Sequence, residues 1–141
     1  MSNDNDLSLL VERTLAASPR QIYDAWVRHL DTWFAAPGSI SMQDELIPFW
    51  FATEHEGARY SHYGRFLVLD EPSVIEMTWV TGRNGTDGAE TVVRVELLPT
   101  ESGTALTLRH SGFYDDAARD QHLDAWPRVL EHLDHTLQSS N

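Results

Sequence analysis

The stretch Asp115–Leu137, DDAARDQHLDAWPRVLEHLDHTL, has the clearest structural pattern in the chain. Its apolar residues recur at helical spacing, which predicts a long helix with one apolar side. Asp115 and Asp116 suit the N-terminus of this helix, where carboxylates cap free backbone N–H groups and favour the helix dipole. Pro127 removes one backbone donor, so we expect a kink or a fresh helical start around 125–127. The apolar side consists of Ala118, Ala125, Trp126, Val129, Leu130, Leu133 and Leu137.

Such a helix needs a partner surface for its apolar side, and the residues before it have the pattern of a sheet. Short segments in which apolar and polar residues alternate are separated by turns, as in strands that bury one face. Consecutive strands joined by short turns pair antiparallel, and such a sheet can bury one face and leave the other in water. We expect strands over residues 7–15, 47–55, 59–69, 74–80, 90–98 and 104–110.

Two short helices are expected between the first strand and the others. Ser18 and Pro19 mark a helix start, with serine as the cap and proline in the first helical position, and this helix should end near His29. A second short helix should include Trp33. The sequence therefore predicts an α+β domain, in which a curved antiparallel sheet of about six strands wraps around a long C-terminal helix, with two short helices after strand 1.

Length and charge limit the class of protein. The 141 residues suit one domain, with an ordered core over about residues 7–138. There are 22 acidic and 10 basic residues, a formal net charge of −12 that should repel nucleic acid and anionic membranes. The sequence has no cysteine, no signal-like start and no apolar run that could span a bilayer. We therefore predict a cytoplasmic protein with neither a nucleic-acid partner nor a membrane-inserted segment.

Four segments carry a resemblance to a known family. They are SPRQIYDAWVRHLDTWFAAPGS (18–39), YGRFLVLDEPSVIEMTW (63–79), TVVRVELLPTESGTALTLRHSGF (91–113) and HLDAWPRVLEHL (122–133). They resemble the heat-shock ATPase activator homologue family of the START-like (SRPBCC, helix-grip) superfamily over nearly the full length. Two departures are Ala125, where a glycine usually precedes Trp126, and the absence of the family's usual glycine pair between residues 39 and 58.

The resemblance implies the helix-grip fold and a cavity for an apolar ligand between the sheet and the last helix. It also implies a link to the stress response and a chaperone as one conceivable partner. The superfamily includes lipid carriers, polyketide cyclases and pollen allergens, so these motifs specify the fold much better than the function.

The candidate ligand-binding residues are mainly aromatic or apolar. Core packing is the commoner role of any one such residue, and lining a cavity is the alternative. Which of Phe49, Trp50 and Phe51 faces inward is left open by the pattern. The expected ligand-binding residues are Trp33, Trp50, Met77, Trp79, Val95, His110, Trp126 and Leu130.

Two histidines have an ambiguous role. His110 has the parity of the leucines in its strand, so it should point towards the long helix. As a satisfied core group it would pair with Tyr60, Tyr63 or His122, and as a functional group it would orient a ligand's carbonyl or hydroxyl. His122, one turn before Trp126 on the same helix face, has the same two interpretations.

No catalytic, cofactor or metal signature is present. The chain lacks a nucleophile elbow, a phosphate-binding glycine loop and a zinc-protease motif, and no inward carboxylate accompanies His110. His132 and His135 have no third ligand at a fitting offset. We therefore expect no cofactor, no metal and no catalytic residue, and the sequence favours a role other than catalysis.

We interpret the chain as a binding domain for a small apolar or amphipathic molecule. One alternative is a cyclase-like or dehydratase-like enzyme that uses His110 as acid–base in the same cavity. The other is a co-chaperone-like or regulatory interaction module with an apolar outer patch over Phe66 and Val68. Strand 59–69 is apolar on both parities, so its outer side could also meet a second copy in a homodimer.

Overall fold

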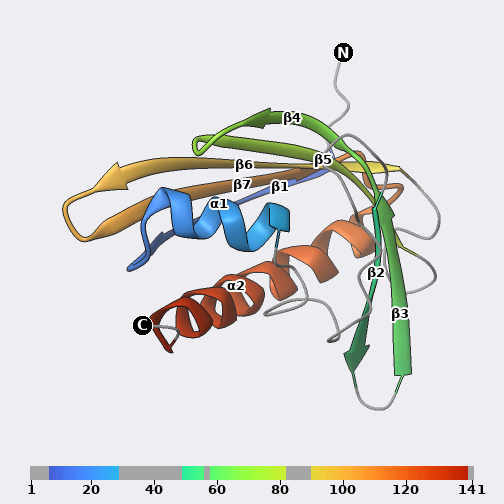
Figure 1. Ribbon diagram of the computed structural model, residues 1–141. Coiled ribbons are helices and arrows are strands. Elements are labelled where there is room, and N and C mark those ends of the chain that lie inside the picture. Colours follow the sequence, from blue (N-terminus) through green and yellow to red (C-terminus); the bar gives the residue numbers. More distant parts are fainter. Residues whose placement is uncertain (1–6, 29–48, 56–57, 82–89, 140–141) are drawn as a thin grey trace.

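The computed structural model of the protein describes residues 7–28, 49–55, 58–81 and 90–139 (Figure 1). The predicted helix around Trp33 lies outside the described residues. The elements, in chain order, are β1 (Ser8–Leu15), α1 (Pro19–Arg28), β2 (Phe49–His55), β3 (Ala58–Gly64), β4 (Phe66–Asp70), β5 (Val74–Thr81), β6 (Thr91–Thr100), β7 (Gly103–Ser111) and α2 (Asp116–Ser139).

The strands form one antiparallel sheet that curves around α2. Its order is β1-β7-β6-β5-β3-β2, and β4 pairs with β5 beside this path. In Figure 1 both helices lie on the same side of the sheet, and β2 and β3 bend down past the end where α2 begins. The α+β architecture predicted from the sequence is therefore confirmed, with seven strands in place of about six.

The extra strand arises because the segment expected as one strand over 59–69 is broken at Arg65. Its backbone N–H donates to Thr78 Oγ1 (2.9 Å) instead of to a backbone carbonyl, and the Arg65 carbonyl accepts from the Thr78 N–H (2.9 Å). The register then shifts between Phe66 and Val68. A shift of one residue sends the following side chains to the opposite face. The exposed apolar pair is Leu67 and Val68, whereas Phe66 packs against the core. The outer patch expected over Phe66 and Val68 is therefore correct for Val68 and wrong for Phe66.

Helix α1 begins as the sequence predicts. The Gln21 N–H donates to Ser18 Oγ (3.2 Å), and the Ser18 N–H donates to Gln21 Oε1 (2.9 Å). These reciprocal bonds form a capping box, which satisfies backbone donors that the first helical turn leaves free. The buried side of α1 consists of Ile22, Tyr23, Ala25, Trp26 and Val27.

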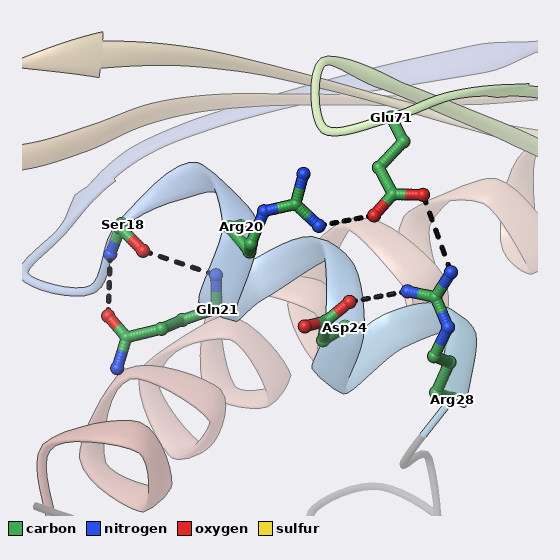
Figure 2. A network of polar contacts seen from close by, with 6 residues as sticks. All are labelled: Ser18, Arg20, Gln21, Asp24, Arg28 and Glu71. Carbon is green, nitrogen blue, oxygen red and sulfur yellow. Dashed lines mark hydrogen bonds and ion pairs between the residues drawn. The ribbon is translucent and has the colours of Figure 1, made fainter.

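An ion-pair network fixes α1 to the turn between β4 and β5 (Figure 2). The Glu71 carboxylate of that turn forms ion pairs with Arg20 through Oε2 and with Arg28 through Oε1, which lies 3.4 Å from Arg28 Nη2. Arg28 also pairs with Asp24. The Arg20 guanidinium is the main reason that the pKa of the Glu71 carboxyl lies below its ordinary 4.5. Because the network is exposed, its individual pairs contribute little to stability.

The core lies between the sheet and the apolar side of α2. Alternate residues of β6 and β7 point inward, and each of these strands is buried on this face only. Trp126, Leu130 and Leu133 of α2 pack against them with at most 2% of their surface exposed. Pro127 lies inside a continuous helix. Of the two outcomes expected around residues 125–127, a kink or a fresh helical start, the fresh start is therefore not observed. Among the described helices, none has an apolar stretch long enough to cross a bilayer.

Candidate functional site

An aromatic cluster lies where the first half of α2 meets the sheet. Trp26 stacks on Trp126 with ring centroids 6.0 Å apart, and Trp79 lies 5.5 Å from Trp126. His110 lies 4.3 Å from Phe113. The cluster draws its rings from α1, β5, β7, the segment after β7, and α2. We call the six rings Trp26, Trp79, His110, Phe113, His122 and Trp126 the aromatic cluster.

A chain of hydrogen bonds runs through this cluster and fixes the proton on His110. The Trp126 indole N–H donates to His110 Nδ1 (3.1 Å), and His110 Nε2 lies 2.7 Å from Thr91 Oγ1. The Thr91 hydroxyl donates its own proton to the Trp79 carbonyl (2.5 Å). An indole nitrogen can only donate, so Nδ1 is the acceptor and a neutral imidazole then carries its proton on Nε2. His110 therefore donates from Nε2 to Thr91 Oγ1.

His110 has the character of a satisfied core group. Burial lowers its pKa well below the ordinary 6.5, with a smaller contribution from His122, so the ring is neutral. Both ring nitrogens are taken, by Thr91 and Trp126, and the expectation that Tyr60, Tyr63 or His122 supplies its hydrogen-bond partner is wrong. General acid–base chemistry by His110 would have to break one of these two buried bonds.

Thr91 is the residue that the sequence reasoning missed. Its side chain is fully buried and has the same inward parity as Val93 and Val95 on β6. A hydroxyl at an inward position of an otherwise apolar strand needs a buried partner. That signal was available in the sequence, whereas the identity of the partner required the register of β6 against β7.

His122 lies at the edge of the cluster, on α2. Its ring meets His110 edge-on at 5.0 Å and Phe113 at 4.9 Å. Nδ1 lies 2.8 Å from the Ala118 carbonyl one turn earlier, so Nδ1 carries the proton and donates it. Burial lowers the pKa of His122 below 6.5, partly offset by the bond to Ala118. This ring is half-buried, in contrast to the enclosed His110.

The structure brings together six of the eight residues expected to bind a ligand. These six are at most 2% exposed and lie on the inner face of the sheet or on the side of α2 that covers it. Trp33 lies outside the described residues, and of Trp50 only the backbone is described. No cluster of three or more metal-ligating side chains occurs within the part of the chain that is described. The six are Met77, Trp79, Val95, His110, Trp126 and Leu130.

Comparison with known proteins gives one family and many similar folds. The family model of the Activator of Hsp90 ATPase homolog 1-like protein matches residues 16–138. No match was found among curated proteins.

Solved bacterial structures cover almost the whole chain. A Mesorhizobium loti protein is 21% identical over 95% of this chain and 98% of its own, with a TM-score of 0.76. A Chromobacterium violaceum protein is 20% identical over 94% of this chain and 96% of its own, with a TM-score of 0.77. A Silicibacter pomeroyi protein of the same activator type is 25% identical over 95% of this chain and 99% of its own, with a TM-score of 0.73. These likenesses show the helix-grip fold.

Proposed function

This chain belongs to the Activator of Hsp90 ATPase homolog 1-like family, and from that premise we propose that it binds a small hydrophobic or amphipathic molecule between the sheet and α2. The family supports a ligand-binding or regulatory domain in general. The aromatic cluster is the observation that favours ligand binding, because it gathers six rings beneath a curved sheet.

The polar atoms inside the cluster are bonded to one another, and this favours an apolar ligand over a polar one. His110, Thr91 and the indole N–H of Trp126 already satisfy one another, so a ligand beside them meets ring faces and not unpaired polar groups. Apolar burial contributes about 25 cal/mol per Å², and the cost of immobilising the ligand cancels part of this gain. Micromolar affinity is the expected scale.

Access to the site should be from the side of His122. The inner residues Met77, Val95 and Leu130 have no exposed surface, whereas the His122 ring is half-buried. A ligand would therefore insert between α2 and the sheet from this edge, and α2 would move to admit it. Domains often gate buried sites by such local opening.

A neutral, environment-sensitive dye tests the proposal. We expect one dye to bind per chain with micromolar affinity, and Val95→Trp to reduce binding because it fills the inner face. The matched control is Leu98→Trp on the same strand, where the side chain is 67% exposed on the outer face. Thermal melts report whether each variant folds. A folded native protein that binds no dye would overturn the proposal, whatever the variants do.

The cyclase or dehydratase alternative gains no support from His110. That mechanism needs a ring nitrogen free to exchange a proton with a substrate. Both nitrogens of His110 are bonded within the protein, and neither partner is a tyrosine or a carboxylate.

A second candidate function is an interaction module that acts through β4. Leu67 and Val68 are 40% and 37% exposed, and among the described strands β4 pairs only with β5. An exposed apolar edge strand is a ready site for another chain, either a second copy or a chaperone. Native mass spectrometry would show a dimer and a copurified ligand together. We expect Val68→Glu to dissociate such a dimer, with Leu10→Glu on β1 as the exposed control.

A further inference from the structure

The two histidines of the aromatic cluster use their nitrogens in opposite ways. His110 accepts at Nδ1 and donates from Nε2, so neither nitrogen has capacity left for a ligand. His122 donates from Nδ1 to the Ala118 carbonyl. A neutral imidazole has one N–H and one lone pair, so the lone pair of His122 is on Nε2.

This Nε2 is an unused acceptor within the part of the chain that the structure describes. The only polar contact of the His122 ring there is the bond from Nδ1 to Ala118. The ring is half-buried, and it packs edge-on against His110 and beside Phe113. A hydrogen-bond acceptor next to an apolar surface is the usual arrangement by which a pocket orients a largely apolar molecule.

The charges nearby limit which ligand this acceptor can serve. Burial lowers the pKa of His122, so the ring is neutral at pH 7 and offers no positive charge. The nearest arginine along α2, Arg119, is paired with Asp116 and Asp120. A ligand carboxylate or phosphate would meet a lone pair and carboxylates, which is unfavourable. A hydroxyl or N–H donor would complete the one open hydrogen bond.

We infer that His122 Nε2 accepts a hydrogen bond from the ligand, and that the ligand is a neutral molecule with an apolar ring body and one O–H or N–H donor. This inference rests on the proposed function, and of the two histidines for which an orienting role was expected it assigns that role to His122 and not to His110. Phenols, alcohols and cyclic amides have this chemistry.

The tautomers test the inference without any ligand. In protein labelled with ¹⁵N at histidine, long-range ¹H–¹⁵N correlation distinguishes protonated from unprotonated ring nitrogens. We expect the Nε2–H form for His110 and the Nδ1–H form for His122. An Nε2–H tautomer at His122 would remove the lone pair and overturn the inference, while leaving the proposed binding of apolar molecules intact.

Two ligands that differ only in one hydrogen-bond donor test whether His122 Nε2 accepts a bond from the ligand. We would measure the affinities of 1-naphthol and 1-methoxynaphthalene, which share an aromatic body, for the native protein and for His122→Phe. The ratio of the two dissociation constants should favour naphthol about fivefold more in the native protein than in the variant, the effect of one net hydrogen bond. His135→Phe, an exposed histidine on the same helix, should leave the ratio unchanged.

Each outcome bears on one of the two proposals. If neither naphthalene binds, the proposed function fails. If both bind and His122→Phe leaves the ratio as in the native protein, the inference about His122 fails and the apolar binding site stands. Thermal melts identify a variant that does not fold. In that case the inference is tested on the native protein, by the change in the ¹⁵N chemical shift of His122 Nε2 when naphthol is added. An unchanged resonance with naphthol bound contradicts the inference.

Discussion

The indole N–H of Trp126 and Nδ1 of His110 are joined by a 3.1 Å hydrogen bond that links the long helix to the last strand inside an apolar core. The bond has two effects. It satisfies the one polar atom of a large buried aromatic residue, and it fixes the tautomer of the histidine, which in turn donates to Thr91. A single contact therefore sets the state of the polar chain as far as the Trp79 carbonyl.

Replacing His110 by leucine should destabilise the protein although leucine is apolar. The indole N–H of Trp126 would lose its acceptor inside the core, and an unsatisfied buried donor costs about 1–3 kcal/mol. Urea unfolding of His110→Leu measures the loss. In a Trp126→Phe background, which has no indole N–H, the same substitution should cost about 1 kcal/mol less. Equal losses in the two backgrounds would show that the bond makes no net contribution.

Trp126→Ala should be among the most destabilising substitutions in α2. The side chain is 2% exposed and contacts Trp26 and Trp79, and truncating a buried tryptophan typically costs about 3–5 kcal/mol. Thermal melts should show a drop in Tm of many degrees. Leu123→Ala is the control, because Leu123 is 42% exposed on the same helix and should change stability by less than about 1 kcal/mol. Similar melting points for the two variants would contradict the assigned helix face.

Stability should fall as the pH drops through the range in which free histidine titrates. The pKa values of His110 and His122 are lowered, chiefly by burial, so in the folded state both rings resist protonation. The unfolded chain takes up these protons near pH 6.5, and the free energy of unfolding therefore decreases as the pH falls below that value. The slope reaches at most about 1.4 kcal/mol per pH unit for His110. His122 should contribute less because its ring is partly exposed.

Urea unfolding between about pH 7.5 and about pH 5.5 measures this dependence above the range in which carboxylates titrate. The variant His110→Leu should have a shallower slope than the native protein. A native slope of zero, or an unchanged slope in the variant, would mean that His110 is protonated as readily in the folded as in the unfolded state.

Gly103→Ala should strain the turn between β6 and β7. Gly103 has a φ of +151°, and a Cβ built there would lie 2.0 Å from the Leu15 carbonyl oxygen. The hydroxyl of the next residue, Thr104, donates a hydrogen bond to the Ala17 carbonyl (2.7 Å), so the turn cannot move away from Leu15 without losing this bond. We expect a loss of about 1–3 kcal/mol in urea unfolding. Ser102→Ala in the same turn is exposed and should be nearly neutral.

The parts of the fold that depend on local pattern were predictable. The inward residues of β6 and β7, the Ser18 cap of α1 and the apolar side of α2 all follow from alternation, helical spacing or capping chemistry. The break at Arg65 was not predictable, because its cause is the side chain of Thr78 on a neighbouring strand.

The candidate site was predictable in position and not in detail. Parity places His110 opposite the long helix, and the structure confirms that orientation. Its partners depend on the alignment of β6 and β7, in which Val93 and not Thr91 is directly opposite His110. Thr91 therefore reaches the histidine diagonally, a relationship that no single-strand pattern contains.

The pairing of β1 with β7 has a consequence for synthesis on the ribosome. Ser8 pairs with Ser111 and Leu15 with Thr104, so β1 finds its partner only after the ribosome has made β7. Closing so long a loop costs entropy, whereas the hairpins of β4 with β5 and of β6 with β7 need only short turns. The nascent β1 must therefore wait for its strand partner, with the apolar face of Leu9, Val11 and Leu15 not yet covered by the finished core, until β7 emerges.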